Sequence, residues 1–165
     1  MNKVELYRRA FRLLGNFTPL KTDCGVLCGR RCCHGDADTG MLLFPGEATV
    51  LPVRDAGGRR VAVCGGRCSR ETRPLSCRLF PLFPVPDGRG GLTAAADPRG
   101  AICPLVRHAA QVRFSHRFRA RVAAVGRLLL CDADCRAFLE HVWAEMADAE
   151  ALRSSLTADG TEEKI

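Results

Sequence analysis

The chain has 165 residues, ten of them cysteine, and a formal net charge of +7. This length suits a single domain that buries a core of its own, and no apolar run approaches the ~18 residues that a membrane span needs. Charged side chains interrupt the N-terminal stretch, which argues against a secretory signal peptide. We therefore expect a cytoplasmic protein without a membrane partner, in which clustered cysteines stay reduced and bind metal or carry out redox chemistry.

The first part of the chain is predicted to begin with a helix over residues 4–14, which Gly15 can end. Its apolar side chains recur with helical spacing at Val4, Tyr7, Phe11 and Leu14. Further on, the glycine-containing stretch 54–60 predicts a hairpin tip, and residues 61–64 predict a strand.

The middle of the chain is dense in glycine and proline from residue 65 to residue 91. This composition predicts an irregular conformation, with one helical turn at 75–79. The residues that follow, 92–98, predict a strand that ends at Pro98.

The C-terminal part is predicted to be helical. One or two helices follow Cys103, with Ser115 as an N-cap, and a last helix starts at Asp132 or Asp134. The apolar stripes predict a core face made of Phe118, Val122, Val125, Leu129, Phe138, Leu139, Val142, Trp143 and Met146. The polar tail, 157–165, is expected to fray.

Together these elements predict one domain over 1–165 with an α+β fold. A small, irregular, cysteine-rich region with short strands, 24–105, would be nucleated by metal. It would pack on an N-terminal helix and on a helical part at 106–156.

Eight of the ten cysteines fall into two groups along the sequence. The first group has the spacing C-x3-C-x3-C-C, and the second begins with C-x3-C. The groups are Cys24, Cys28, Cys32 and Cys33, and then Cys64, Cys68, Cys77 and Cys103. A soft metal ion or an iron–sulfur cluster takes about four thiolates, so either group can supply one site. One site that mixes the two segments is the alternative, and the sequence leaves the choice open.

The adjacent pair Cys32 and Cys33 poses a separate question, because neighbouring side chains rarely point the same way. Either one of them ligates while the other packs, or the two serve different centres. The three-residue gaps between the early cysteines favour an iron–sulfur cluster slightly over zinc.

Arginines lie within both cysteine groups, and their charge would offset that of a thiolate centre. Four thiolates around Zn²⁺, or around a [4Fe–4S]²⁺ cluster, sum to a charge of about −2. The arginines concerned are Arg30 and Arg31 in the first group and Arg67, Arg70, Arg73 and Arg78 in the second. A purely solvated role for these side chains is the alternative.

The stretch "CGVLCGRRCC", followed by "CGGRCSRETRPLSCRLFP", resembles the YkgJ-type cysteine-cluster family of zinc- or iron-chelating domains. The resemblance covers residues 24–105 and includes a Cys-Arg-x-aromatic-Pro signature that starts at Cys77. This cysteine pattern is also distantly similar to the cysteine region of flagellin lysine N-methylases. The resemblance implies metal chelation, with the ligands drawn from Cys24, Cys28, Cys32, Cys33, Cys64, Cys68, Cys77 and Cys103.

The remaining cysteines and histidines carry weaker signals. Cys131 and Cys135 are interpreted as small buried or cap-adjacent residues; a redox role for Cys135, with a pKa lowered by the helix dipole, is the alternative. His34 can replace one thiolate as a ligand, or it is an ordinary loop histidine. The other histidines, which are His108, His116 and His141, are expected at the surface.

Nucleic acid is not an expected partner, although the chain is basic. The helical stripe of Arg113, Arg117 and Arg121 is typical of a solvated helix face and has no interleaved aromatic residues for base stacking. No catalytic triad and no phosphate-binding loop is evident, so the sequence leaves open whether the chain is an enzyme.

The sequence therefore predicts a metal-binding protein that holds an iron–sulfur cluster or Zn²⁺ through cysteine thiolates. Such a centre would serve redox chemistry or the modification of a partner protein. The alternatives are a thiol–disulfide redox protein and a zinc-structured interaction module that uses the basic helix.

Overall fold

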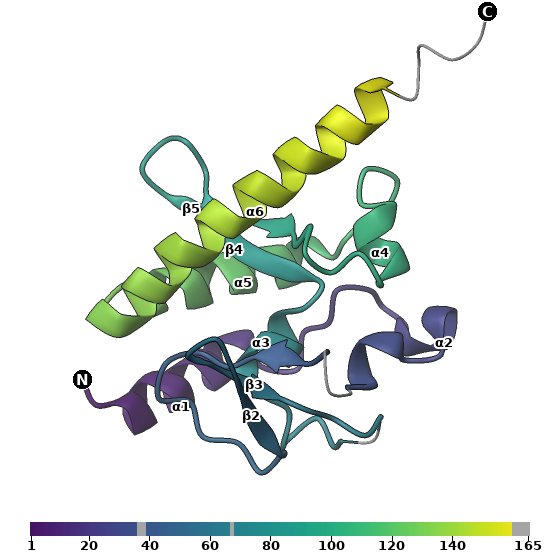
Figure 1. The fold of residues 1–165 in the computed structure, drawn as a ribbon. Helices are drawn as coiled ribbons and strands as arrows, with labels where there is room; N and C mark the ends of the chain where they lie inside the picture. The colour runs from purple at the N-terminus through teal and green to yellow at the C-terminus, as the bar shows by residue number, and fades with distance from the viewer. Residues whose placement is uncertain (36–38, 67, 160–165) are drawn as a thin grey trace, which may run out of the picture.

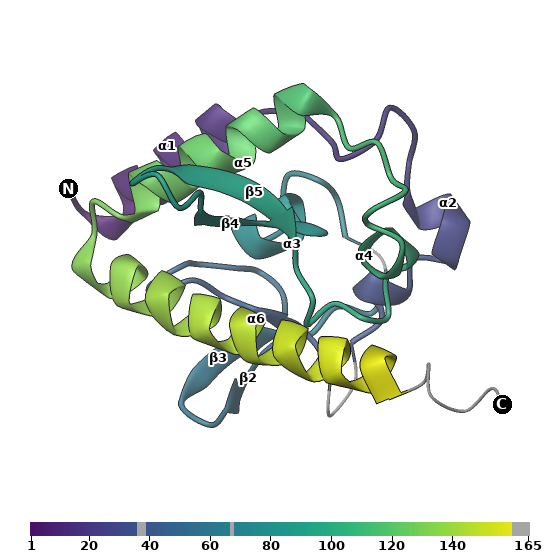
Figure 2. The same cartoon turned by 90° about the horizontal axis from the view of Figure 1, so that it is seen from above.

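The fold was analysed in a computed structural model, which describes residues 1–35, 39–66 and 68–159. Three long helices dominate it, and they surround a two-stranded hairpin (Figures 1 and 2). The helices are α1 (Lys3–Leu14), α5 (His116–Leu129) and α6 (Ala133–Asp159). Helix α1 packs along α5, and α5 and α6 flank the hairpin on opposite sides. The predicted α+β fold is confirmed.

Helix α1 begins and ends where its caps predict. The Asn2 side chain accepts a hydrogen bond from the Glu5 backbone N–H at 2.9 Å, and Gly15 ends the helix with a φ of +55°. The buried face differs from the predicted stripe, because Val4 is 72% exposed. The side chains that α1 buries are Leu6, Tyr7, Ala10 and Leu14. The helical period was right, but the face turned to α5 is rotated toward Leu6 and Ala10.

The two C-terminal helices match the prediction more closely. Ser115 caps α5 by accepting from the Phe118 backbone N–H, and Asp132 accepts from Cys135 N at 3.0 Å in the first turn of α6. The predicted stripe of Phe118, Val122, Val125 and Leu129 is fully buried. Helix α6 continues to Asp159, into the segment expected to fray, and residues 160–165 of that tail lie outside the described residues.

A close approach between α5 and the hairpin depends on one glycine. A Cβ at Gly126 would lie 2.4 Å from the Cβ of Pro84, so no larger residue fits there without a shift. On the other side, Trp143 of α6 donates from Nε1 to the Pro84 carbonyl at 2.7 Å. The hairpin is thereby fixed between the two helices.

The described residues form two antiparallel sheets. The first has the strand order β1-β3-β2 and consists of β1 (Met41–Leu42), β2 (Val53–Ala56) and β3 (Arg59–Ala62). Gly57 and Gly58 form its hairpin turn with φ of +63° and +80°, as a two-residue turn of this kind requires, and the predicted hairpin tip is confirmed.

The second sheet pairs β4 (Leu82–Pro86) with β5 (Leu92–Ala96). The strand at 92–98 and the helical turn α3 (Leu75–Leu79) were predicted. The irregular conformation predicted around β4 was wrong. Prolines argue against a central strand, but β4 is one strand of a two-stranded hairpin, where proline is tolerated.

One hydrophobic core joins these elements, and it includes part of the cysteine-rich segment. Phe44 stacks on Phe83 of β4 with ring centroids 6.2 Å apart and meets Phe138 of α6 at 5.2 Å. Leu75 and Leu79 of α3 are fully buried in the same core. Within 24–105, α3, β4 and β5 are therefore held by apolar packing.

The most deeply buried carboxyl group among the described residues is that of Glu47. Glu47 is 1% exposed, and it accepts hydrogen bonds from the backbone N–H groups of Leu75 at 2.5 Å and Phe44 at 3.2 Å. It thereby caps the start of α3. Burial raises the pKa of Glu47 to about 7, although these hydrogen bonds lower it.

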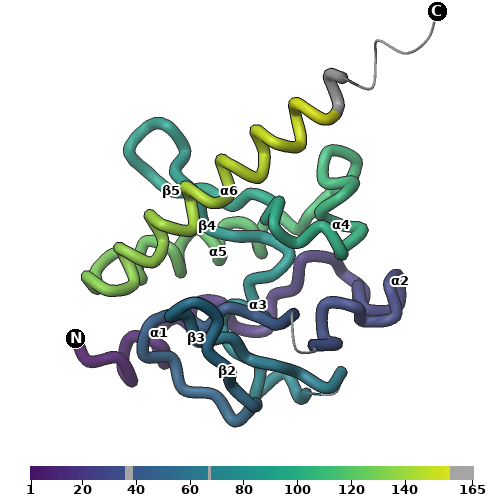
Figure 3. The backbone as a smooth tube through the Cα atoms, in the orientation of Figure 1, coloured from purple at the N-terminus to yellow at the C-terminus, as the bar shows by residue number. Residues whose placement is uncertain are grey.

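The remaining helical segments are short and gather at one end of the molecule, away from the turn between α5 and α6 (Figure 3). They are α2 (Gly25–Cys28), a single 3-10 turn η1 (Arg31–Cys33) and α4 (Pro104–Arg107). Within the described residues, no helix combines the length and apolar character that crossing a membrane requires.

Candidate metal centre

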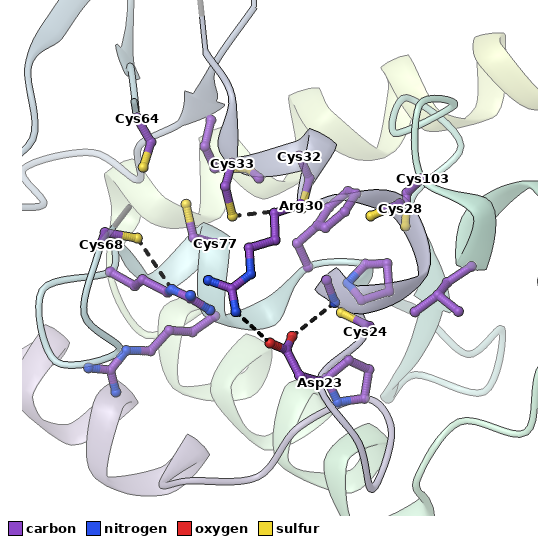
Figure 4. A pocket seen from close by; sticks show the side chains of 18 of the residues that line it. Asp23, Cys24, Cys28, Arg30, Cys32, Cys33, Cys64, Cys68, Cys77 and Cys103 are labelled. Carbon is purple, nitrogen blue, oxygen red and sulfur yellow. Dashed lines mark hydrogen bonds and ion pairs between the residues drawn. The ribbon is translucent and has the colours of Figure 1, made fainter. Parts of the chain in front are cut away.

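Eight cysteines that are far apart in the sequence line one cavity of about 120 Å³ at this end of the molecule (Figure 4). They are the eight predicted as ligands: Cys24, Cys28, Cys32, Cys33, Cys64, Cys68, Cys77 and Cys103. All of them are free thiols in the structure. The fold thus brings the two sequence groups to a common place.

The segments that carry Cys33 and Cys64 are joined by backbone hydrogen bonds. Gly35 N donates to the Cys64 carbonyl and Gly66 N donates to the Cys33 carbonyl, both at 2.8 Å, on either side of a bridge between His34 and Gly65. Gly66 has a φ of +84°, and a Cβ there would lie 2.5 Å from the His34 ring. Glycine is therefore required where the two segments cross.

Cys68 and Cys77 reach the same side of the cavity. Cys77 lies on α3, which the core fixes through its buried leucines. Arg73 donates from Nε to the Cys68 sulfur at 3.3 Å. Burial is the main reason why the pKa of Cys77 is raised to about 12. The nearby Cys68, Cys33 and Cys64 raise this pKa further.

Cys24, Cys28 and Cys103 lie on the other side. Cys24 precedes the single turn of α2 and Cys28 ends it, so both thiols can face one way. Cys103 caps α4, where its carbonyl accepts from Arg107 N at 3.0 Å. Cys24 packs against a second, small apolar cluster that consists of Cys103, Leu105 and Val106.

The adjacent cysteines both face the cavity, and neither packs away from it. The sulfur atoms of Cys32 and Cys33 are 4.0 Å apart. The hydrogen bond between them lowers the pKa of Cys33, helped by the charges of Arg73 and Arg30, and raises the pKa of Cys32 together with burial. A thiolate is therefore favoured at Cys33.

A carboxylate that the sequence analysis did not single out organises the cavity wall. Asp23 accepts from Gly25 N at 2.9 Å and from the guanidinium of Arg30 at 2.9 Å. Arg30 itself has a φ of +58°, in the left-handed region, at the start of η1. The "TDCG" stretch carried this signal, because an aspartate two residues before a glycine can close a turn on its N–H.

Four of the six arginines predicted near the thiols line the cavity: Arg30, Arg70, Arg73 and Arg78. Arg31 lines neighbouring surface clefts, and Arg67 lies outside the described residues. Within the part of the chain that the structure describes, the Nε atoms of Arg70 and Arg78 are buried without a hydrogen-bond partner.

Burial lowers the pKa of both Arg70 and Arg78, and the charge of Arg73 adds to the effect. Crowded positive charges at a cavity wall favour an anionic group inside the cavity. The donor set therefore fits a thiolate-bound metal, which carries net negative charge.

The described thiols are too far apart, as they stand, to coordinate one ion. Among the residues in 1–35, 39–66 and 68–159, no three His, Cys, Asp or Glu side chains are arranged so that they could hold an ion as they stand. His34 is exposed and lines a neighbouring cleft, so the structure does not place it among the cysteines of the cavity.

The other two cysteines lie at the turn between α5 and α6, at the far end of the molecule (Figure 1). Cys131 is exposed, whereas Cys135 is fully buried with its sulfur 3.5 Å from the Tyr7 hydroxyl. Burial raises the pKa of Cys135 to about 11. The alternative of an exposed Cys135 with a lowered pKa was therefore wrong, because the core covers this thiol.

No family model, no curated protein and no solved structure matches the chain. The resemblance to the YkgJ-type family stays a prediction.

Proposed function

We propose that this chain is a cytoplasmic metal-binding protein whose eight clustered cysteines hold metal as thiolates. The convergence of these eight thiols on one cavity carries the proposal. A hydrophobic core does not need cysteine in particular, whereas a soft metal ion or cluster needs about four thiolates in reach of one another.

An iron–sulfur cluster is favoured over zinc. The cavity of about 120 Å³ exceeds the space that one ion fills, since even a water molecule takes only about 30 Å³ in the liquid. The three-residue gaps between the early cysteines add a weak preference for a cluster, because they are wider than C-x2-C although within the two to four residues that zinc sites use. Such a cluster, when bound, supplies one-electron redox chemistry; zinc supplies a structural link.

The protein's own residues contribute charge and position. Arg73 donates to the Cys68 sulfur, and Arg30 is held at the cavity by Asp23. Besides the hydrogen bond with Cys32, the charges of both arginines lower the pKa of Cys33 and so favour its thiolate. The backbone hydrogen bonds at Gly35 and Gly66 hold the Cys33 and Cys64 segments side by side.

The test is elemental analysis of the full chain purified without oxygen, with assay of acid-labile sulfide and titration of free thiols. Iron with labile sulfide is the expected result, and zinc without sulfide would assign the zinc alternative. A metal-free chain with disulfides would support the thiol–disulfide alternative. A metal-free chain with all ten thiols reactive would contradict the proposal.

A further inference from the structure

We infer that the cavity holds two separate tetrathiolate centres, and that the adjacent pair Cys32 and Cys33 gives one sulfur to each. This inference rests on the proposed function. The α3 quartet consists of Cys33, Cys64, Cys68 and Cys77. The α2 quartet consists of Cys24, Cys28, Cys32 and Cys103. The order of cysteines along the chain gives a different grouping, in which Cys32 and Cys33 stay together and Cys103 joins the later cysteines.

The α3 quartet is defined by how its segments are joined. Two backbone hydrogen bonds of 2.8 Å fasten the Cys33 segment to the Cys64 segment. Cys68 and Cys77 line the same cavity as Cys33 and Cys64. Figure 4 shows these four sulfur atoms gathered on one side of the cavity.

The α2 quartet is defined by one helical turn and one apolar contact. Cys24 precedes the turn of α2 and Cys28 ends it, and Cys24 packs against the apolar cluster of Cys103, Leu105 and Val106. Cys28, Cys32 and Cys103 line the same cavity. Figure 4 shows these four cysteines on the opposite side of the cavity from Cys64 and Cys68.

The division falls between two consecutive residues because of the local backbone. Cys32 and Cys33 lie in a 3-10 turn, in which successive side chains point about 120° apart. Cys33 can therefore serve one side while Cys32 serves the other. Each loaded centre carries a charge of about −2, and Arg30 extends between the two quartets (Figure 4), where its positive charge reduces their repulsion.

Two matched double variants separate this grouping from the grouping by sequence order. Cys33→Ser with Cys64→Ser removes two ligands from the α3 quartet alone. Cys33→Ser with Cys28→Ser removes one ligand from each quartet. The full chain of each variant is isolated without oxygen, and iron, zinc and labile sulfide per chain are measured.

We expect the first double variant to keep half of the wild-type metal and the second to lose nearly all of it. Grouping by sequence order requires the reverse, because Cys28 and Cys33 would then share a centre. That reverse result, or loss of all metal from both variants, overturns the inference. In either case, the presence of iron with labile sulfide identifies an iron–sulfur cluster, and the presence of zinc without sulfide identifies a zinc centre.

Alkylation mapped by mass spectrometry gives a second readout on the milder single variants. In metal-loaded Cys64→Ser, we expect Cys33, Cys68 and Cys77 to become reactive while the α2 quartet stays protected. Cys28→Ser should expose the rest of the α2 quartet alone. Exposure of all remaining cavity thiols in both variants overturns the inference. Absence of metal from the wild-type chain would instead contradict the proposed function, so the two failures are distinguishable.

Discussion

The two ends of this molecule are held together by different means. At the helical end, α1, α5, α6 and the β4–β5 hairpin bury large apolar side chains completely, among them Phe118 and Leu139. At the cysteine end, the segments are short, glycine turns join them, and half-buried thiols face a cavity. Burial of an apolar side chain stabilises the fold by about 1.5–3 kcal/mol each, and the cysteine end has few such side chains. We infer that metal supplies there what apolar packing supplies elsewhere.

Removal of the metal should produce the largest difference in stability between the two ends. Structural zinc sites contribute about 10–16 kcal/mol of binding free energy in small domains, and a cluster held by thiolates acts in the same way. A chelator under reducing conditions should therefore remove amide-exchange protection from 24–35, 64–66 and 68–73 and leave α3, α5 and α6 protected. Equal loss at both ends, or no change at either, would contradict the account.

Truncation of the apolar core should act on the whole molecule. Phe118→Ala leaves a cavity where a fully buried ring packs, so it should lower the free energy of unfolding by about 3–5 kcal/mol in denaturant titrations. Val4→Ala is the control, because Val4 is exposed and should change it by less than about 0.5 kcal/mol. Equal effects of the two would refute the assigned core face of α1 and α5.

The buried carboxyl of Glu47 should make stability depend on pH. Burial raises its pKa in the fold to about 7, from an ordinary value of 4.5. The folded chain therefore holds a proton that the unfolded chain has lost, and the contribution to stability is present below pH 4.5 and lost as the pH rises through 7.

Glu47→Gln removes this titration. Relative to the variant, the wild type should lose about 3 kcal/mol of unfolding free energy across that interval, measured by denaturant titrations at several pH values. A constant difference between the two proteins over the same interval would show that Glu47 does not hold the extra proton.

The smallest effect is expected from a glycine at the cysteine end. Gly66→Ala places a Cβ against the His34 ring and disturbs the bonds between the Cys33 and Cys64 segments. Gly58→Ala is matched for a positive φ, +80° against +84°, but has open space around it. Both should cost about 1 kcal/mol of stability. Only Gly66→Ala should also lower the metal content, and a loss in both variants would remove the special role of Gly66.

The sequence predicted the helical end better than the cysteine end, for a physical reason. Helical spacing and caps are local signals, so Ser115, Asp132 and the stripe that starts at Phe118 could be read in order along the chain. Strand β4 was missed because its pairing with β5 is not local and its prolines argue against a strand.

The candidate site was predicted as a set of residues but not as an arrangement. Residue type and spacing singled out the eight cysteines that the fold brings to one cavity. Their grouping depends on the bridge between His34 and Gly65, which joins segments distant in the sequence and leaves no local signal. The same holds for Cys135, because its burial depends on Tyr7 of α1.

X-ray absorption at the metal edge of the wild-type chain, purified without oxygen, tests the central claim most directly. The account predicts metal coordinated by sulfur alone, with a metal–sulfur distance of about 2.3 Å. A chain that folds without metal, or a metal shell made of nitrogen and oxygen, would contradict it.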